Sequence, residues 1–241
     1  MIIVGTCGFP KSRIEVFGKL RAVEVQETFY KFADPATVKK WRREAPREFV
    51  FAVKASQFIT HDPSSPTYRR SELGIGNSDA GRYGSFKPTR EVLAAWRRTE
   101  ETCKFLDAKA VVFQTPASFK PTEENVENLH KFLGKAETKM IRVWEPRGSW
   151  PQEVIKDICE RWGLVHCVDP FAGETTTQNV AYFHLLGKPP GTRNYYYAYS
   201  DADLTKLRAA CQGFGEVYVF FNNIAMFADA TRFRGLLDVQ E

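Results

Sequence analysis

The sequence predicts an α/β fold, a single (β/α)8 TIM-type barrel with a long loop after the third strand. Eight short apolar runs recur along the chain, and helical segments with recognisable caps separate them. The length of 241 residues is close to the roughly 250 that such a barrel usually has. Alternating strands and helices form a parallel sheet, and eight repeats in this length favour a closed barrel over an open sheet. No change of composition and no linker interrupts the chain, so we expect one domain over residues 1–241.

The predicted strands are rich in β-branched residues and are apolar throughout, rather than at every second position. This pattern is typical of parallel strands that are covered on both faces. We expect strands at residues 2–4, 22–25, 49–53, 110–113, 141–144, 164–168, 180–185 and 217–221.

Most of the predicted helices begin at a residue whose side chain can accept a hydrogen bond from the first turn. These capping residues are Asp34, Thr89, Thr122, Ser149 and Ser200. Their helices are expected to end near residues 45, 106, 134, 163 and 213, and a last helix is expected over residues 224–237. Ser149 and Gln152 have the spacing of a capping box. Two further helices, over residues 11–20 and 171–178, look short.

The net charge of +5 and the pI near 8.9 favour anionic partners in general. The chain has no polybasic tail of the kind that binds nucleic acid, and a mildly basic solvated surface explains the same numbers. The five cysteines form no CxxC motif, which excludes a zinc knuckle and a thioredoxin-type site. The first residues lack the basic region of a secretory signal, and no apolar run has the length of a bilayer span. We therefore expect a cytoplasmic protein without a membrane partner, and the sequence does not indicate its oligomeric state.

Residues 60–88 interrupt the regular alternation, because this segment is long and rich in Pro, Ser, Gly and Arg. Loops of this length inside a compact domain are uncommon and tend to be functional or disordered. The segment follows the C-terminal end of a strand, so it would overhang the mouth of the barrel. Its basic residues are Arg69, Arg70, Arg82 and Lys87. We expect either a lid that contacts an anionic ligand or a solvated insertion.

Polar residues follow almost every predicted strand. In a barrel of this kind the C-terminal strand ends form the functional face, whereas the opposite face serves stability. The polar residues at these ends are Thr6, Cys7, Gln26, Thr28, Lys54, Gln114, Glu145, Arg147, Asp169, His184, Asn222 and Asn223.

Lys54 directly follows an apolar strand, so its ammonium group is expected to face the barrel mouth. Such a lysine can form a Schiff base if its pKa is lowered, or it can remain charged and hold an anion. The alternative is a structural ion pair with Glu145 or Glu24, because buried charges usually have partners.

Glu145 and Arg147 lie two residues apart, next to a predicted helix N-terminus that itself favours anions. Glu145 could act as a general acid or base, and Arg147 could hold a carboxylate or phosphate with two hydrogen bonds. Pairing of the two residues with each other is the alternative.

The sequence gives little support for a metal or a cysteine nucleophile. His184, Glu145 and Asp169 offer a nitrogen and two carboxylates that could bind a divalent metal. No HxH or HExxH spacing occurs, so a metal is possible but no metal ligand is predicted, and the cofactor is unknown. For Cys7, a small buried residue in a turn is favoured over a nucleophile, because the sequence places no base beside it.

Six motifs, in the same order, resemble those of a known family. They are Gly5-Thr6-Cys7-Gly8, residues 23–30, residues 49–54 with Thr60-His61, Gln114-Thr115-Pro116, residues 145–150, and residues 217–223 with the helix that follows. Over nearly its full length the chain resembles the YecE-like family, domain of unknown function 72. The resemblance implies a TIM-type barrel but no reaction, because the family is named for lacking one. It marks as recurring polar positions Thr6, Glu24, Thr28, Lys54, His61, Gln114, Glu145, Arg147, Asn222 and Asn223.

Two stretches depart from the family pattern. Gln26 stands where the family usually has Asn. His184-Leu185-Leu186-Gly187 stands where it usually has Arg-x-His-Gly, which puts in question any activity that relies on that Arg and His. The family barrel also resembles those of the xylose-isomerase and endonuclease IV groups, a likeness of fold only.

Three functions follow as hypotheses. The first is an enzyme on a small anionic or phosphorylated substrate, with Lys54 and Glu145 catalytic and the other marked positions binding substrate. The second is a barrel that binds or cleaves nucleic acid, for which a salt-dependent affinity is the signature. The third is a binding protein without catalysis, supported only by the altered motif at His184.

Overall fold

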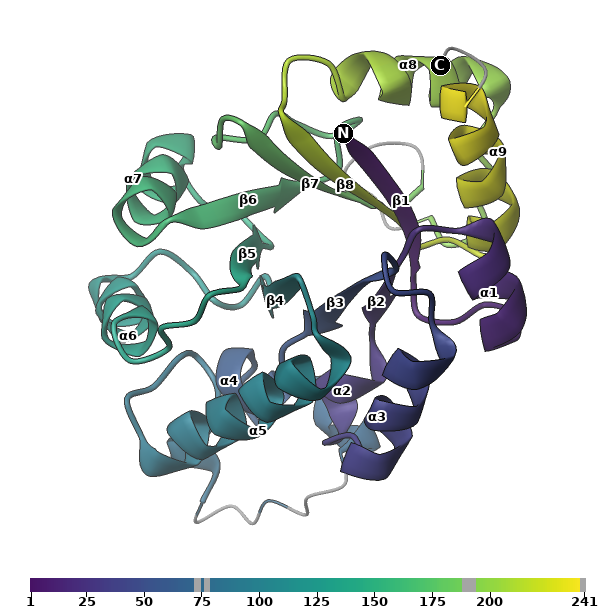
Figure 1. The fold of residues 1–241 in the computed structure, drawn as a ribbon. Helices are drawn as coiled ribbons and strands as arrows, with labels where there is room; N and C mark the ends of the chain where they lie inside the picture. Colours follow the sequence, from purple (N-terminus) through teal and green to yellow (C-terminus); the bar gives the residue numbers. More distant parts are fainter. Residues whose placement is uncertain (72–74, 76–78, 188–193, 239–241) are drawn as a thin grey trace.

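The strands close into a parallel barrel (Figure 1). The computed structural model describes residues 1–71, 75, 79–187 and 194–238. Within these residues the strands are β1 (Ile2–Cys7), β2 (Ala22–Val25), β3 (Val50–Lys54), β4 (Ala110–Thr115), β5 (Ile141–Pro146), β6 (Leu164–Val168), β7 (Val180–Leu185) and β8 (Glu216–Phe221). They pair in sequence order, and β1 also pairs with β8. The predicted TIM-type barrel is confirmed, and each strand overlaps a predicted one.

Helices surround the barrel (Figure 1). In the described part of the chain they are α1 (Arg13–Lys19), α2 (Glu27–Tyr30), α3 (Pro35–Glu44), α4 (Gln57–Thr60), α5 (Arg90–Leu106), α6 (Glu123–Leu133), α7 (Gln152–Trp162), α8 (Asp201–Ala210) and α9 (Met226–Asp238), with the 3₁₀ segments η1 (Pro66–Arg70) and η2 (Ala80–Arg82). Four predicted capping residues accept a hydrogen bond from the first turn, as expected: Asp34, Thr89, Thr122 and Ser200. None of the described helices is long and apolar enough to cross a membrane.

The predicted capping box at Ser149 is wrong. Helix α7 begins after Pro151, which makes no side-chain capping bond. Gly148, with a φ of +93°, turns the chain just before the helix, and its carbonyl accepts a hydrogen bond from the amide of Trp150 (3.1 Å). This turn displaces Ser149 from the capping position, so α7 lacks a side-chain cap.

The predicted short helix over residues 171–178 is also wrong, because turns join β6 to β7. The carbonyl of Asp169 accepts hydrogen bonds from the amides of Ala172 (2.8 Å) and Gly173 (3.1 Å). The hydroxyl of Thr175 donates to the carbonyl of His166 (2.8 Å). Such bonds between short polar side chains and nearby backbone compete with helix formation.

Buried apolar side chains cover both faces of the sheet. One cluster lies between the strands and the helices, and a second fills the barrel interior. Strands β3 and β4 contribute small interior residues such as Ala52 and Ala110. On the opposite side, the rings of Tyr182 and Phe220 stack with centroids 5.1 Å apart. The barrel interior is therefore a packed core, as is usual for this fold.

The predicted loop over residues 60–88 is anchored to the barrel. It passes through η1 and η2, and the amides of Gly84 and Phe86 donate to the carbonyls of Phe58 (2.9 Å) and Ile59 (2.8 Å). The Phe86 side chain is buried against Phe113 of the core. Residues 72–74 and 76–78 lie outside the described residues, so the lid function stays a prediction.

Candidate functional site

A ring of polar side chains lies inside the barrel at the C-terminal strand ends. Side chains alternate across a strand, so the second residue after an inward apolar residue also points inward. In this way Lys54 follows Ala52, and Glu145 follows Val143. The same alternation and the strand register place on the inner face Cys7, Glu24, Gln114, Cys167 and His184.

His184 joins two carboxylates from different parts of the barrel. Its Nε2 lies 2.7 Å from Glu24 Oε2, and its Nδ1 lies 3.1 Å from Glu145 Oε2. An ionised carboxylate can only accept hydrogen bonds, so both ring nitrogens must donate, and the imidazole must be protonated. Burial by itself lowers the pKa of His184, but the neighbouring thiols and carboxylates outweigh it and raise that pKa well above its usual value.

Glu24 is fully buried and has further donors. The Tyr182 hydroxyl donates to Glu24 Oε2 (2.6 Å), and the Gln26 side-chain amide donates to Oε1. Burial raises the pKa of Glu24, but His184 and the Tyr182 hydrogen bond oppose it and hold the pKa below its usual value. Glu24 therefore carries a negative charge inside the barrel.

Glu145 and Arg147 pair with each other, as the structural alternative predicted. Arg147 donates from Nη2 (2.7 Å) and Nε (3.2 Å) to Glu145 Oε1. Burial raises the pKa of Glu145, but Arg147 and then His184 oppose it and lower the pKa far below its usual range. A carboxylate that stays ionised does not donate a proton, so this geometry favours Glu145 as an anchor for its two cations over a general acid.

Lys54 does not form the direct ion pair with Glu24 or Glu145 that was the structural alternative to a functional role. Its Nζ donates to Gln114 Oε1 (2.7 Å) and lies 4.4 Å from the centroid of the Phe29 ring. Burial lowers the pKa of Lys54, and Arg147 lowers it further, although Glu145 and Glu24 oppose them. The amine is therefore more easily deprotonated than an exposed lysine.

The structure brings together part of the predicted set: Glu24, Lys54, Gln114, Glu145 and Arg147. Other predicted residues hold the backbone in place. Thr6 donates to the carbonyl of Gly8 (2.9 Å), and Thr28 donates to that of Lys54 (2.8 Å). Asn223 donates to the carbonyl of Tyr197 (2.6 Å) and to Asp229 (2.7 Å). Asn222 is buried, and its backbone N–H donates to the carbonyl of Leu185 (3.0 Å).

His61 caps the C-terminus of α4 and lies beside the ring of polar side chains. It is buried, its Nδ1 is 2.8 Å from the Thr60 hydroxyl, and its ring packs edge-on against Phe29. Burial, reinforced by Lys54 and Arg147, lowers the pKa of His61 to about 3. His61 is therefore neutral at pH 7.

The protonation of His61 should destabilise the fold in acid. Its pKa is depressed on folding, so the unfolded state binds the proton more tightly and the loss of stability begins as pH falls below about 6.5. Between pH 7.5 and pH 5 the wild type should lose about 2 kcal/mol more of its free energy of unfolding than His61→Asn. Urea titrations of both proteins at the two pH values measure this difference, and equal losses would contradict it.

The possible metal group of His184, Glu145 and Asp169 does not come together among the described residues. The Asp169 carboxylate instead accepts from the amides of Phe171 (3.0 Å) and Leu186 (3.1 Å). Two other groups place potential ligand atoms within 4.8 Å of one another: Cys7 with Glu24 and His184, and Glu145 with Cys167 and His184.

The sequence did not predict that Cys167 and Tyr182 belong to the site, nor that Gln26 binds Glu24. It favoured a small buried residue over a functional role for Cys7. Cys167 and Tyr182 lie within strands, not after them. The inward alternation along β6 and β7 could have found both residues, because each lies two positions after or before another inward residue. Their contacts with residues on distant strands leave no trace in the sequence.

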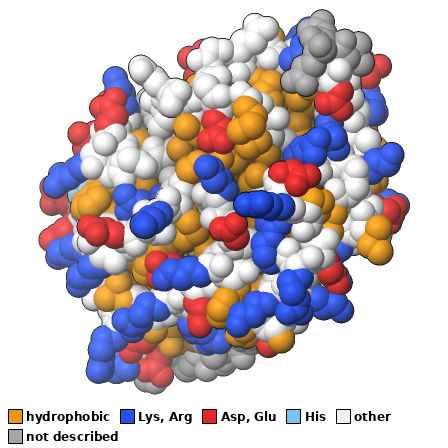
Figure 2. Space-filling model, viewed as in Figure 1, with side chains coloured by type: hydrophobic (Ala, Val, Ile, Leu, Met, Phe, Trp, Pro, Cys, Tyr) orange, Lys and Arg blue, Asp and Glu red, His pale blue; other side chains and the backbone are white. Residues whose placement is uncertain are grey.

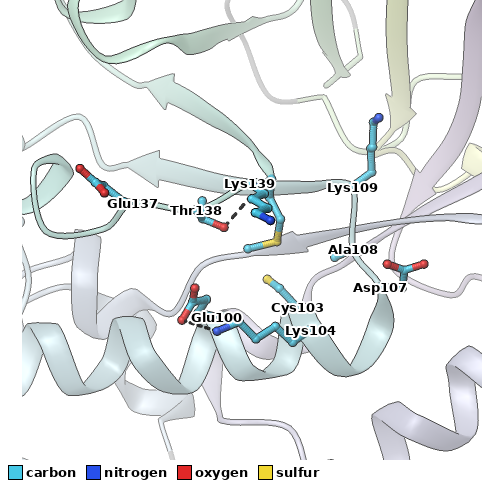
Figure 3. A pocket seen from close by; sticks show the side chains of 10 residues that line it. Glu100, Cys103, Lys104, Asp107, Ala108, Lys109, Glu137, Thr138 and Lys139 are labelled. Carbon is cyan, nitrogen blue, oxygen red and sulfur yellow. Dashed lines mark hydrogen bonds and ion pairs between the residues drawn. The ribbon is translucent and has the colours of Figure 1, made fainter.

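A cavity of about 440 Å³ opens beside Arg147 at the ends of β5 and β6. Its lining includes Glu145, Asp169 and Glu174. A second cavity, of about 790 Å³, lies near the N-terminal ends of β4 and β5 (Figure 3). There Glu100 pairs with Lys104 (3.0 Å). Because that end of the barrel usually serves stability, the cavity beside Arg147 is the better candidate.

The closed parallel barrel, with polar side chains gathered at its C-terminal strand ends, defines a protein of the TIM-barrel class. The model of a family described as "Protein of unknown function DUF72" matches residues 15–241. The chain therefore belongs to this family. The search of curated proteins found no significant match.

Solved structures agree with this assignment. A DUF72 family protein from Thermotoga maritima is 23% identical, with a TM-score of 0.73 and 99% of each chain covered. One from Enterococcus faecalis is 21% identical, with a TM-score of 0.73 and coverage of 99% of this chain and 98% of the other. Endonuclease IV from Thermus thermophilus is 14% identical, with a TM-score of 0.56 and coverage of 99% and 97%. At these identities the similarity shows the fold alone.

The geometry gives a meaning to one departure from the family pattern. The resemblance implies an Arg where this chain has His184, and the contacts of His184 with Glu24 and Glu145 require its imidazole to be positively charged.

Proposed function

We propose that the chain is an enzyme that acts on a small anionic or phosphorylated substrate at the C-terminal face of the barrel. The observation that carries this proposal is the position of two cations, Lys54 and Arg147, around one side of the mouth. Lys54 contacts Gln114 on β4, Gln114 is the register neighbour of Glu145 on β5, and Glu145 holds Arg147. Each cation also lowers the pKa of His61, so both lie near the same group.

Both cations keep donors for a ligand. An ammonium group has three N–H donors and a guanidinium group has five. Among the described residues, Lys54 Nζ has one side-chain acceptor, Gln114, and Arg147 uses Nε and Nη2 on Glu145. A phosphate or carboxylate that accepts from Lys54 and from Arg147 Nη1 would complete these hydrogen bonds.

The cavity beside Arg147 supports a small substrate. Its volume of about 440 Å³ is within the range of ligand pockets, roughly 300–1,000 Å³. Asp169 and Glu174 in its lining can accept hydrogen bonds from hydroxyl groups. Arg147 lines this cavity and Lys54 does not, so the proposed substrate is a compound whose anionic group would lie at the edge of the cavity, between the cations, and whose hydroxyl groups would reach these carboxylates.

Lys54 is the proposed catalytic group. As an ammonium it would hold the substrate's anionic group, and its lowered pKa makes that ammonium a stronger acid, able to give a proton to the reacting group. In this proposal Glu145 orients Arg147 and stays ionised. The five cysteines are buried and unpaired, which suits the reducing cytoplasm that we propose as its location.

Loss of Lys54 should weaken anion binding. Calorimetric titration of chelator-treated protein with inorganic phosphate, pyrophosphate and small sugar phosphates should find a ligand. Lys54→Met should bind it at least about tenfold more weakly, which corresponds to about 1.4 kcal/mol. Lys109→Met is the matched control, because this exposed lysine precedes β4 at the opposite end of the barrel, and its affinity should stay unchanged.

Two outcomes would contradict this proposal: a wild type that binds none of these anions, or equal affinity in Lys54→Met. Binding without turnover of any bound compound would instead favour a binding protein without catalysis.

The basic residues of the segment over residues 60–88 give the nucleic-acid alternative less support than the sequence suggested, because several of them have partners within the protein. Arg82 lies 3.4 Å from Asp79, Lys87 lies 3.5 Å from Asp62, and Arg70 lies over the Tyr30 ring. On the face drawn in Figure 2, positive and negative side chains are interspersed. Binding of an oligonucleotide that weakens steeply with salt would support this alternative over a small substrate.

A further inference from the structure

We propose that Cys7, Glu24 and His184 form a binding site for a zinc-class divalent metal ion inside the barrel mouth. The three side chains come from β1, β2 and β7. Each is at least nine-tenths buried, and their ligand atoms lie within 4.8 Å of one another. A thiolate, a carboxylate and an imidazole together suit Zn²⁺ or Co²⁺ and not the oxygen-seeking Mg²⁺ or Ca²⁺.

The second ring nitrogen of His184 is already oriented as in many metal sites. A histidine that binds a metal through one nitrogen usually donates the other N–H to a carboxylate, which fixes the ring. Nε2 faces Glu24, on the side of the proposed ion, and Nδ1 lies 3.1 Å from Glu145 Oε2. Glu145 is therefore a positioning residue for the site.

The outer contacts distinguish this group from the one formed by Glu145, Cys167 and His184. Glu24 accepts from two neutral donors, the Tyr182 hydroxyl and the Gln26 amide, which can orient a ligating carboxylate without repelling a cation. Lys54 acts on Glu24 without a direct ion pair, whereas the cationic Arg147 lies 2.7 Å from Glu145 and would repel a metal ion more strongly. The ion should therefore bind on the Glu24 side.

Metal binding requires only small movements and no net change of charge. Bond lengths of about 2.0–2.3 Å at a tetrahedral ion separate its ligands by roughly 3.4 Å, so the 2.7 Å contact between Glu24 Oε2 and His184 Nε2 must lengthen by roughly 0.7 Å. The ion replaces one proton on His184 and one on Cys7. Three protein ligands leave a fourth position for water or substrate.

Cobalt spectroscopy tests the site directly. Chelator-treated wild type should take up one equivalent of Co²⁺ and develop a thiolate-to-cobalt charge-transfer band with strong visible bands of tetrahedral cobalt. Cys7→Ser should lose the charge-transfer band. Cys167→Ser, at the other thiol beside His184, and Cys103→Ser, at a distant buried thiol, should retain it. Lys54→Met should also retain it, so failure of the anion proposal and failure of this one can be told apart.

X-ray absorption spectroscopy of zinc-loaded wild type measures the number of sulfur ligands directly. This measurement does not depend on whether any variant folds. One sulfur in the metal's coordination shell supports the proposal. The proposal is overturned if the wild type develops no charge-transfer band, if the shell contains no sulfur, or if Cys167→Ser and not Cys7→Ser loses the band.

Discussion

Replacement of His184 by leucine should lower the free energy of unfolding by about 3–5 kcal/mol, the range found when one partner of a buried ion pair is removed. Glu24 is fully buried and Glu145 nearly so, and both contact the imidazole. Leucine cannot donate a hydrogen bond, so two carboxylates would share the barrel interior without the cation between them. Urea denaturation of wild type and His184→Leu measures the loss.

Two further variants separate charge from packing at this position. His184→Arg keeps a cation between the two carboxylates, so it should recover at least half of the lost stability. His130→Ala changes a histidine outside the barrel, whose contact is Trp162 on α7, and should cost about 1 kcal/mol or less. A loss in His184→Leu no larger than that of His130→Ala would show that the buried charge network contributes little.

Substitution of Gly84 by alanine should destabilise the protein by about 3 kcal/mol or more. Its φ of +73° is unfavourable for a residue with a side chain. A Cβ would also overlap the backbone carbonyl of His61, which cannot rotate away as a side chain can. The hydrogen bond from the Gly84 amide to Phe58 would be strained at the same time.

Gly81→Ala is the matched control, because it lies three residues earlier in the same segment and an added Cβ would meet no atom within 4 Å. It should change the free energy of unfolding by no more than about 0.5 kcal/mol. Thermal or urea unfolding of both variants tests the comparison. Equal stabilities would mean that residues 80–88 are not held against α4 as the hydrogen bonds indicate.

The barrel was predictable because its strands are strong local signals. A run such as residues 110–113 is apolar on both faces and lies between a capped helix and a polar strand end, so no other interpretation competes. The failures are local as well. At residues 171–178 the bonds of Thr175 and Asp169 to nearby backbone outweigh helix propensity, and at Ser149 a glycine turn displaces the cap.

The site was predictable only in part. Lys54, Glu145 and Arg147 could be found because they directly follow or end strands. The contact between Glu24 and His184 joins residues 160 positions apart, and only closure of the barrel brings β2 and β7 to opposite sides of one small space. No pattern within a strand indicates which carboxylate a buried histidine will meet.

The pairing of β1 with β8 has a consequence for biosynthesis. Ile2 of β1 pairs with Val217 of β8. The ribosome synthesises β8 about 200 residues, or roughly 10–40 s, after β1, and until then β1 lacks this partner. During that time one edge of β1 can pair with other chains. Closure of the ring is therefore a late event that depends on distant contacts, which form slowly, and the nascent chain should need protection from aggregation until translation is complete.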